Sequence, residues 1–326
     1  MDKVKVGVIG LGYFANAMHL PSLTRNSEIE IVAVADPDEN NLNSTAAKYG
    51  FRKTYRDYRE MLKKEKLEAV YVIVNVKATL EVASATMEAR IPTLLEKPPG
   101  VTSAETRKLI EVADRTGTLN IVAFNRRHAP PIMKAKEVFG DTRQRMVSAK
   151  MLRYRRYEEH FVAGTGIHSL DALRYLGGDV AEVYTVSAPA TDDKGGTNLV
   201  SLLQYESGAV GQMTIETACG MVYEGYEMHG DFMTVFVTMP QGGYSDDPGR
   251  IEVWQGAMFP FKSFYTDIAE THRQHGVLDG IWEEENSLIR HLKAGTRSPN
   301  DVHDGLKTML LAEAIEKGGH QVVEKP

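Results

Sequence analysis

The sequence predicts a two-domain α/β protein. We expect an N-terminal Rossmann doubly wound parallel sheet and a C-terminal α+β domain with a large, mostly antiparallel sheet. Three observations predict this fold class: a glycine-rich turn follows the first apolar strand, strands and helices alternate over the first third, and short strands with tight turns dominate after residue 180. With 326 residues, the chain is long enough for two domains that each bury their own core.

The first strand and its turn resemble a dinucleotide-binding fingerprint. Val4 to Ile9 is an apolar run typical of a buried parallel strand. Gly10 would permit the tight turn, Gly12 would let a pyrophosphate approach the backbone, and Ala15 would let the next helix pack closely. The N-terminus of that helix would attract the phosphates. The turn therefore predicts cofactor contacts from Gly10, Gly12, Tyr13, Phe14 and Ala15.

The second strand supplies the acidic residue that this fingerprint requires. Ile29 to Ala35 is apolar and ends in Asp36, which lies 36 − 15 = 21 residues after Ala15. This matches the spacing of the acid that binds the ribose hydroxyls. Alternatively, Asp36 only caps the next helix, which Pro37 would help to start. Because strand, glycines and acid are in register, we expect an NAD cofactor, with NADP as the other possibility.

The remaining elements place the domain boundary near residue 125. In the first domain, residues 1–124, we expect helices at 39–49, 55–64, 80–89 and 102–115, and strands at 69–76, 92–95 and 119–124. In the second, residues 125–326, we expect helices at 131–139, 166–176, 282–294 and 302–317, and strands at 146–154, 183–188, 198–205, 209–217, 226–228, 233–238 and 250–254. The last helix, about 302–317, could pack back on the first domain.

Composition narrows the class of partner. The net charge of −6, without a basic cluster, argues against a nucleic-acid surface, and no apolar run approaches membrane-spanning length. The first strand starts so early that it leaves no room for a signal peptide, and Cys219 is the single cysteine. We therefore expect a cytoplasmic protein. The open face of the second sheet could be a substrate wall or a subunit interface, so we expect a homodimer or homotetramer.

The short strand at 92–95 points to a reactive lysine. It delivers Glu96, Lys97 and Pro98 to the carboxyl edge of the sheet, where ligands bind in open parallel sheets. Partial desolvation would lower the pKa of Lys97 and suit it to hydrogen-bond a reacting hydroxyl. The alternative is a surface Lys–Glu pair before a proline turn.

Several motifs occur in one order: Gly10-x-Gly12, Asp36-Pro37, Glu96-Lys97-Pro98, residues 124–127 (F-N-R-R) and residues 166–171 (G-I-H-S-L-D). Over essentially the whole chain, the sequence resembles the Gfo/Idh/MocA oxidoreductases, the glucose–fructose oxidoreductase and inositol dehydrogenase family. The resemblance implies that Lys97 touches the substrate hydroxyl near the nicotinamide and that His168 is the catalytic acid/base. The candidate cofactor set then also contains Asn75, Glu96, Lys97 and Asn125. The candidate substrate set contains Lys97, Arg127, His160, His168 and Asp171, and no metal is expected.

The sequence departs from the family pattern at Gly164, where relatives usually carry an Asp that accompanies the Lys and His. The T-P-N-x-x-H element is also degraded, at residues 75–80. Asp171 shares the helix face of His168, three residues away. We expect a loop residue to replace the missing acid, with Glu159 or His160 ahead of Glu158. Alternatively, Gly164 makes room for a bulkier substrate, and His168 by itself could be a hydrogen-bonded core histidine.

The sequence thus predicts an NAD(P)-dependent oxidoreductase that transfers a hydride from a secondary alcohol of a sugar, cyclitol or related polyol. One rival is a redox-assisted glycosidase or lyase that retains its NAD. The other is a non-enzymatic, ligand-sensing regulator on the same fold. Gly164 favours the regulator, whereas Lys97 and His168 oppose it.

Overall fold

The computed structural model describes residues 3–191, 193–240, 249–256, 262–265 and 277–326. The chain divides into two compact units. Unit 1 comprises Met1–Phe124 and Ile281–Leu306, and unit 2 comprises Asn125–Gly280 and Lys307–Pro326. The chain leaves unit 1 where the sequence placed the boundary. Residues 281–306, however, return to unit 1, which the expected division at a single point did not include.

Unit 1 is built on a parallel sheet of the Rossmann type. Its six strands have the order β3-β2-β1-β4-β5-β6. Their bounds are Val4–Ile9 (β1), Ile29–Ala35 (β2), Thr54–Tyr55 (β3), Ala69–Val72 (β4), Thr93–Glu96 (β5) and Asn120–Ala123 (β6). The order reverses between β1 and β4, so the carboxyl ends of these two strands mark the point where such sheets bind ligands.

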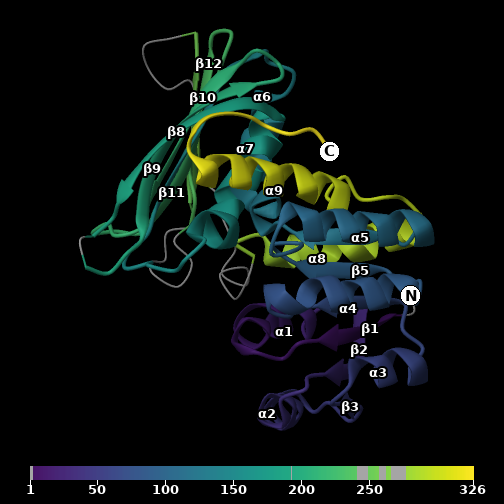
Figure 1. The fold of residues 1–326 in the computed structure, drawn as a ribbon. Coiled ribbons are helices and arrows are strands. Elements are labelled where there is room, and N and C mark those ends of the chain that lie inside the picture. The colour runs from purple at the N-terminus through teal and green to yellow at the C-terminus, as the bar shows by residue number, and fades with distance from the viewer. Residues whose placement is uncertain (1–2, 192, 241–248, 257–261, 266–276) are drawn as a thin grey trace. The chain divides into compact units, whose positions relative to one another are not determined.

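Helices cover the sheet of unit 1 (Figure 1). They are η1 (Ala15–His19), α1 (Leu20–Leu23), α2 (Glu39–Tyr49), α3 (Tyr58–Lys64), α4 (Val76–Glu88), α5 (Ser103–Thr116), α8 (Ile281–Ala294) and the start of α9 (Val302–Lys317). Helix α8 contacts β5, β6, η1 and α1, and α4 packs against α5. The core includes Val6, Val8, Leu94, Ile121 and Leu288, so the returning segment contributes to the same apolar interior.

Three expected elements of unit 1 differ from the prediction by three or more residues at one end, among them the helix expected at 80–89, which begins at Val76. The strand expected at 69–76 ends at Val72, and α4 already begins at Val76, after Asn75 in an extended conformation. An apolar run does not by itself separate a buried strand from a buried helix. The helix expected at 55–64 begins at Tyr58, because the Asp57 side chain accepts a hydrogen bond from the backbone N–H of Arg59 and caps it there. Residues 54–55 form strand β3 instead.

Unit 2 carries the second, mostly antiparallel sheet. The described strands form a nine-stranded sheet of order β14-β13-β12-β11-β7-β10-β9-β8-β15, in which only β7 and β10 pair in parallel. Their bounds are Gln144–Leu152 (β7), Val180–Pro189 (β8), Thr197–Tyr205 (β9), Val210–Glu216 (β10), Tyr223–Gly230 (β11), Met233–Thr238 (β12), Arg250–Gln255 (β13), Lys262–Tyr265 (β14) and Gly319–Val322 (β15). The sequence did not predict β14 and β15.

One face of this sheet is covered and the other carries exposed apolar side chains. The helical segments are η2 (Asn125–His128), α6 (Pro130–Phe139), η3 (Val162–Gly166) and α7 (Ile167–Gly177). Helix α6 contacts β12 and β13, and α7 contacts β7 and β11. Figure 1 shows α6 and α7 on the same side of the sheet. On the other face, neighbouring strands present side chains that are 42% to 59% exposed: Tyr184, Val186, Val200, Leu202 and Val210.

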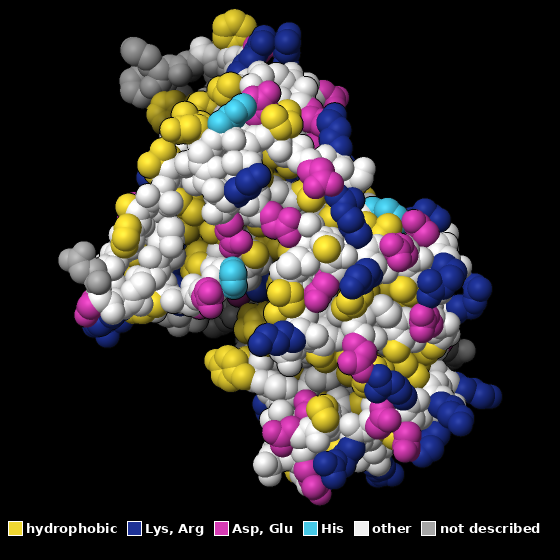
Figure 2. All heavy atoms as spheres, in the orientation of Figure 1, with side chains coloured by type: hydrophobic (Ala, Val, Ile, Leu, Met, Phe, Trp, Pro, Cys, Tyr) yellow, Lys and Arg dark blue, Asp and Glu magenta, His cyan; other side chains and the backbone are white. Residues whose placement is uncertain are grey.

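We expected neither a nucleic-acid surface nor a membrane-spanning segment, and the surface charge and the helices of the structure bear on these two expectations. Figure 2 shows basic and acidic side chains interspersed over the visible face, without a continuous basic patch among the described residues there. Every helix in the described ranges is too short or too polar to cross a membrane.

Candidate active site

The glycine-rich turn of unit 1 combines a tightly packed backbone at Gly10 with an open one at Gly12. Gly10 has φ +92°, and a Cβ atom there would lie 2.1 Å from the carbonyl oxygen of Ile73, so only glycine fits. Around Gly12, nothing in the described part of the chain lies within 4 Å of the position of a Cβ. Ala15 is fully buried against the sheet. The open backbone at Gly12 fits the close approach of a pyrophosphate.

Asp36 is joined to this turn directly. Its Oδ2 accepts a hydrogen bond of 2.7 Å from the backbone N–H of Leu11, and its Oδ1 accepts one of 2.8 Å from that of Asp38. The N-cap of α2 is Asp38 rather than Asp36. A carboxylate oxygen has two lone pairs, so each oxygen of Asp36 can still accept a bond from a ribose hydroxyl.

A residue that the motif did not indicate holds the turn in place. Asn16 donates from Nδ2 to the carbonyl oxygen of Leu11 at 2.7 Å and to Oγ1 of Thr45 at 2.9 Å. The two aromatic residues of the turn, Tyr13 and Phe14, are 88% and 39% exposed and can contact a bound cofactor. Asn75, another predicted cofactor residue, is exposed at the start of α4.

Glu96 and Lys97 lie at the carboxyl end of β5, on the same edge as the glycine-rich turn. The Lys97 side chain is half-buried, and its backbone N–H donates to Oε2 of Glu96 at 3.2 Å. Glu96, which we predicted to contact the cofactor, is buried and forms an ion pair with His19. Its carboxylate is therefore already used inside unit 1, and this burial favours a structural role over a direct cofactor contact.

His19 lies between two carboxylates, an arrangement that the sequence did not predict. Its Nε2 is 2.7 Å from Oε1 of Glu96, and its Nδ1 is 2.9 Å from Oε1 of Glu285 on α8. The imidazole is fully buried. Burial alone would lower its pKa, but the hydrogen bonds and charges of Glu285 and Glu96 raise the pKa of His19 to about 10.

His168 lies in the first turn of α7 in unit 2. Its neighbours Ile167, Ser169 and Leu170 are fully buried, whereas His168 is half-buried. It is therefore positioned at the margin of the core rather than inside it. Lys97 belongs to unit 1 and His168 to unit 2, so their meeting around a substrate stays a prediction.

Arg127 and Asp171 pair with each other. Arg127 donates from Nε and Nη2 to the two carboxylate oxygens of Asp171, each at 2.5 Å, and Thr308 adds a hydrogen bond of 3.0 Å. Asp171 is fully buried and Arg127 is 8% exposed. We predicted that both bind substrate, but this burial favours a structural role that joins η2 to α7 and α9 within unit 2.

The loop before α7 holds the residues proposed to replace the missing acid. Glu158 pairs with Arg156 and accepts a hydrogen bond from Thr165. The side chains of Glu159 and His160 are 90% and 73% exposed. No described atom lies within 4 Å of a Cβ placed on Gly164, so this position has room for a side chain. The exposure of the loop side chains favours the alternative in which Gly164 leaves space.

The start of unit 2 holds a buried charge network beside Asn125. Glu224 accepts hydrogen bonds from Arg126 at 2.9 Å, from Arg153 at 2.5 Å and from the hydroxyl of Tyr226 at 2.7 Å. Asn125, a predicted cofactor residue, donates from Nδ2 to the carbonyl oxygen of Asp279 at 2.8 Å. The sequence singled out neither Glu224 nor Arg153 as partners, because 71 residues separate them.

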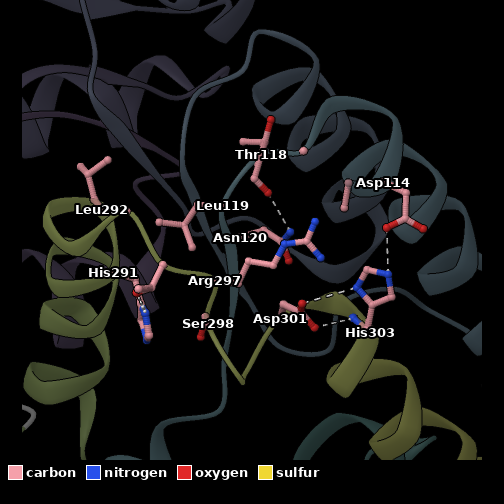
Figure 3. Close-up of a pocket in the computed structure, with 14 residues that line it drawn as sticks. Asp114, Thr118, Leu119, Asn120, His291, Leu292, Arg297, Ser298, Asp301 and His303 are labelled. Carbon is pink, nitrogen blue, oxygen red and sulfur yellow. Dashed lines mark hydrogen bonds and ion pairs between the residues drawn. The ribbon is translucent and has the colours of Figure 1, made fainter.

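A cavity of about 380 Å³ lies elsewhere in unit 1 (Figure 3). It is lined by the end of α5, the end of α8 and the segment that leads into α9. Asn120 in its wall is the first residue of β6, so the cavity lies at the amino ends of the strands. The glycine-rich turn and Lys97 lie at the carboxyl ends, and none of the predicted site residues lines this cavity.

The parallel sheet, the glycine-rich turn and Asp36 define unit 1 as the NAD-binding Rossmann domain of an oxidoreductase. Residues 4–124 match the family model described as "Oxidoreductase family, NAD-binding Rossmann fold". This match assigns residues 4–124 to the NAD-binding domain of the Gfo/Idh/MocA oxidoreductases.

Relatives and solved structures match over nearly the full length. Myo-inositol 2-dehydrogenase of Thermotoga maritima is 24% identical, with 96% of each chain covered. An Agrobacterium radiobacter oxidoreductase, solved with NAD+, L-tartaric acid and magnesium, has a TM-score of 0.83 at 20% identity, with 98% of each chain covered. Levoglucosan dehydrogenase in complex with NADH has a TM-score of 0.84 at 18% identity, with 100% of each chain covered. At these identities, the two solved structures confirm the predicted fold.

Proposed function

We propose that the protein oxidises a secondary alcohol of a sugar, cyclitol or related polyol with NAD as the hydride acceptor. The observation that carries this proposal is the shared edge of unit 1, where the glycine-rich turn, Asp36 and Lys97 follow the carboxyl ends of β1, β2 and β5. A relative named for oxidation of an inositol and a similar structure named for a sugar-derived substrate support the substrate class.

NAD, when bound, supplies the hydride acceptor; Gly10, Gly12 and Asp36 would hold it. His168 takes the proton of the substrate hydroxyl as a general base. The Lys97 ammonium stabilises the negative charge that develops on that oxygen. Both groups suit these tasks because each is half-buried, which excludes part of the surrounding water and strengthens the electrostatic interaction.

A screen of NAD reduction against a panel of sugars, cyclitols and polyols tests this function. Turnover of one class, with loss of turnover in Lys97→Ala, would support the proposal. Binding of panel members without turnover would favour a ligand-sensing regulator. Nicotinamide that copurifies and does not exchange, together with cleavage of a glycosidic bond, would favour a redox-assisted lyase or glycosidase.

We also propose that two or four copies associate through the open face of the sheet in unit 2, and that the protein is cytoplasmic. Exposed side chains such as Val186, Leu202 and Val210 form an apolar surface larger than isolated exposed residues normally provide. Light scattering of wild type and Leu202→Glu measures the assembly. A wild-type monomer at micromolar concentration would contradict the proposed interface.

A further inference from the structure

The two carboxyl groups that face His19 favour a proton on each of its ring nitrogens. A carboxylate can only accept hydrogen bonds, and His19 has one on each side, at 2.7 Å from Glu96 and 2.9 Å from Glu285. With both carboxyl groups ionised, both nitrogens donate and the ring is an imidazolium. A buried cation that joins two carboxylates is costly to desolvate, so its presence beside the cofactor edge calls for a reason.

On one side, His19 links the glycine-rich turn to Lys97 through a series of contacts. The ring of Phe14, in the glycine-rich turn, contacts the His19 ring edge-on, with centroids 5.3 Å apart and planes at 72°. His19 then bonds Oε1 of Glu96, and Oε2 of Glu96 accepts the backbone N–H of Lys97. A continuous set of contacts thus runs from the cofactor-binding turn to the main chain of Lys97.

The other side of His19 is anchored in α8. Glu285 is fully buried, and its Oε2 accepts a hydrogen bond of 2.5 Å from the hydroxyl of Ser22. Its carbonyl oxygen accepts a bond of 3.1 Å from the hydroxyl of Tyr71. Glu285 therefore has little freedom to move, and it fixes the position of His19.

We propose that His19 is a positioning residue, which holds the Glu96–Lys97 backbone at a fixed place relative to the glycine-rich turn so that the Lys97 ammonium is presented to the substrate hydroxyl. The inference rests on the proposed function of Lys97. It assigns the ion pairs of His19 to the alignment of the site, beyond their contribution to stability.

The test compares His19→Gln with a matched variant at the opposite edge of unit 1. His303 also bridges two carboxylates, with Nε2 at 3.0 Å from Asp114 and Nδ1 at 3.5 Å from Asp301 (Figure 3). His19→Gln should lower kcat by about 10-fold or more at saturating substrate and NAD, because small displacements of a positioned group are costly. His303→Gln should leave kcat within about twofold of wild type, because the ion pairs that it removes are partly exposed and lie away from the site.

A second measurement probes the reactivity of the Lys97 amine and does not depend on turnover. The rate at which the Lys97 amine is acetylated by acetic anhydride is followed by mass spectrometry as a function of pH. His19→Gln should change this rate profile at Lys97 and leave Lys77, on the exposed start of α4, as in wild type. His303→Gln should change neither. If His19→Gln lowers Tm while kcat and the Lys97 profile follow His303→Gln, the role is only structural and the proposal fails.

Two further variants serve if His19→Gln does not fold. Glu96→Gln removes the acceptor charge on the lysine side of His19, and Glu285→Gln removes the same charge on the anchor side. The proposal expects a larger change in the Lys97 profile for Glu96→Gln than for Glu285→Gln. Equal changes would overturn it.

If the Lys97 profile responds as expected but no polyol is oxidised, the proposed function fails and the positioning role stands. If a polyol is oxidised while the Lys97 profile does not respond, the function stands and the positioning role fails.

Discussion

The carboxylate of Asp36 accepts a hydrogen bond of 2.7 Å from the backbone N–H of Leu11, which joins the end of β2 to the glycine-rich turn after β1. The bond places the acid beside the turn before any cofactor binds. Asp36 is only 6% exposed, and in the proposed binding mode its negative charge would face the ribose of the dinucleotide.

This charge should select NAD over NADP. A 2′-phosphate would be repelled by Asp36, so we expect the Kd for NAD to be at least about 10-fold lower than that for NADP. Asp36→Ser should reduce the difference between the Kd values for NAD and NADP. Asp38→Ser keeps a side chain that can cap α2 and should leave the preference unchanged. Calorimetric titration of both cofactors measures this, and tighter NADP binding by wild type would contradict it.

Lys97 and His168 should act in the chemical step. Lys97→Ala and His168→Ala should each lower turnover by about 10²-fold or more, the range for a positioned proton-transfer group. Their Tm values should stay near that of wild type because both side chains are only half-buried.

His229→Ala provides the matched control for His168→Ala. His229 lies on β11 in the same unit and bonds Thr234 at 3.0 Å. Its loss should leave turnover intact. If His168→Ala instead unfolds the protein and the remaining folded fraction turns over normally, His168 is a core histidine.

The pKa of His19 predicts an alkaline limit to the stability of unit 1. Glu285 and Glu96 raise this pKa from 6.5 to about 10 against the effect of burial. The folded state thus binds the proton more tightly than the unfolded state. The resulting stabilisation is complete below pH 6.5, declines above it and is lost once the pH exceeds about 10. Thermal unfolding between pH 7 and 10.5 should show Tm falling in wild type more steeply than in His19→Gln. Parallel curves would contradict the assignment.

Glu224 predicts an acid limit in unit 2. Burial would raise its pKa, but the guanidinium groups of Arg126 and Arg153 lower the pKa of Glu224 to about 2. Its contribution to stability is present above pH 4.5 and is lost as the pH falls through about 2.

Glu224→Gln leaves two arginines without their shared carboxylate and should lower the free energy of unfolding by about 3 kcal/mol. Glu227→Gln, exposed on the same strand, should change stability by no more than about 0.5 kcal/mol. Equal denaturation midpoints for these two variants would refute this prediction.

Local patterns predicted the first two strands and the glycine-rich turn because their signals lie close together along the chain. The apolar strand, Gly10 and Asp36 each have a sequence signature, and β1 and β2 have the predicted bounds. His19 had no such signature: its partner Glu285 lies 266 residues away, in a segment assigned to the other domain. The same holds for Asp171, whose position beside His168 on a helix suggested a shared site. Its actual partner, Arg127, is 44 residues away.

The last prediction concerns Gly164, the position at which the family resemblance led us to expect an acid. The proposed substitutes are unevenly placed, since Asp171 is held by Arg127, Glu158 is held by Arg156, and Glu159 and His160 are exposed. A group that fixes the tautomer of a catalytic histidine has to contact it, and solvent-exposed side chains suit this role poorly.

We therefore expect Glu159→Gln and His160→Ala to keep the wild-type pH dependence of kcat/KM. Gly164→Asp should fold, because a Cβ at this position meets no described atom within 4 Å, and should raise KM by filling space that the substrate uses. The three variants and wild type are compared over pH 5 to 10. A large loss in either loop variant, with a shifted basic limb, would identify that residue as the substitute for the acid. Faster turnover in Gly164→Asp would show instead that the missing carboxylate limits proton transfer by His168.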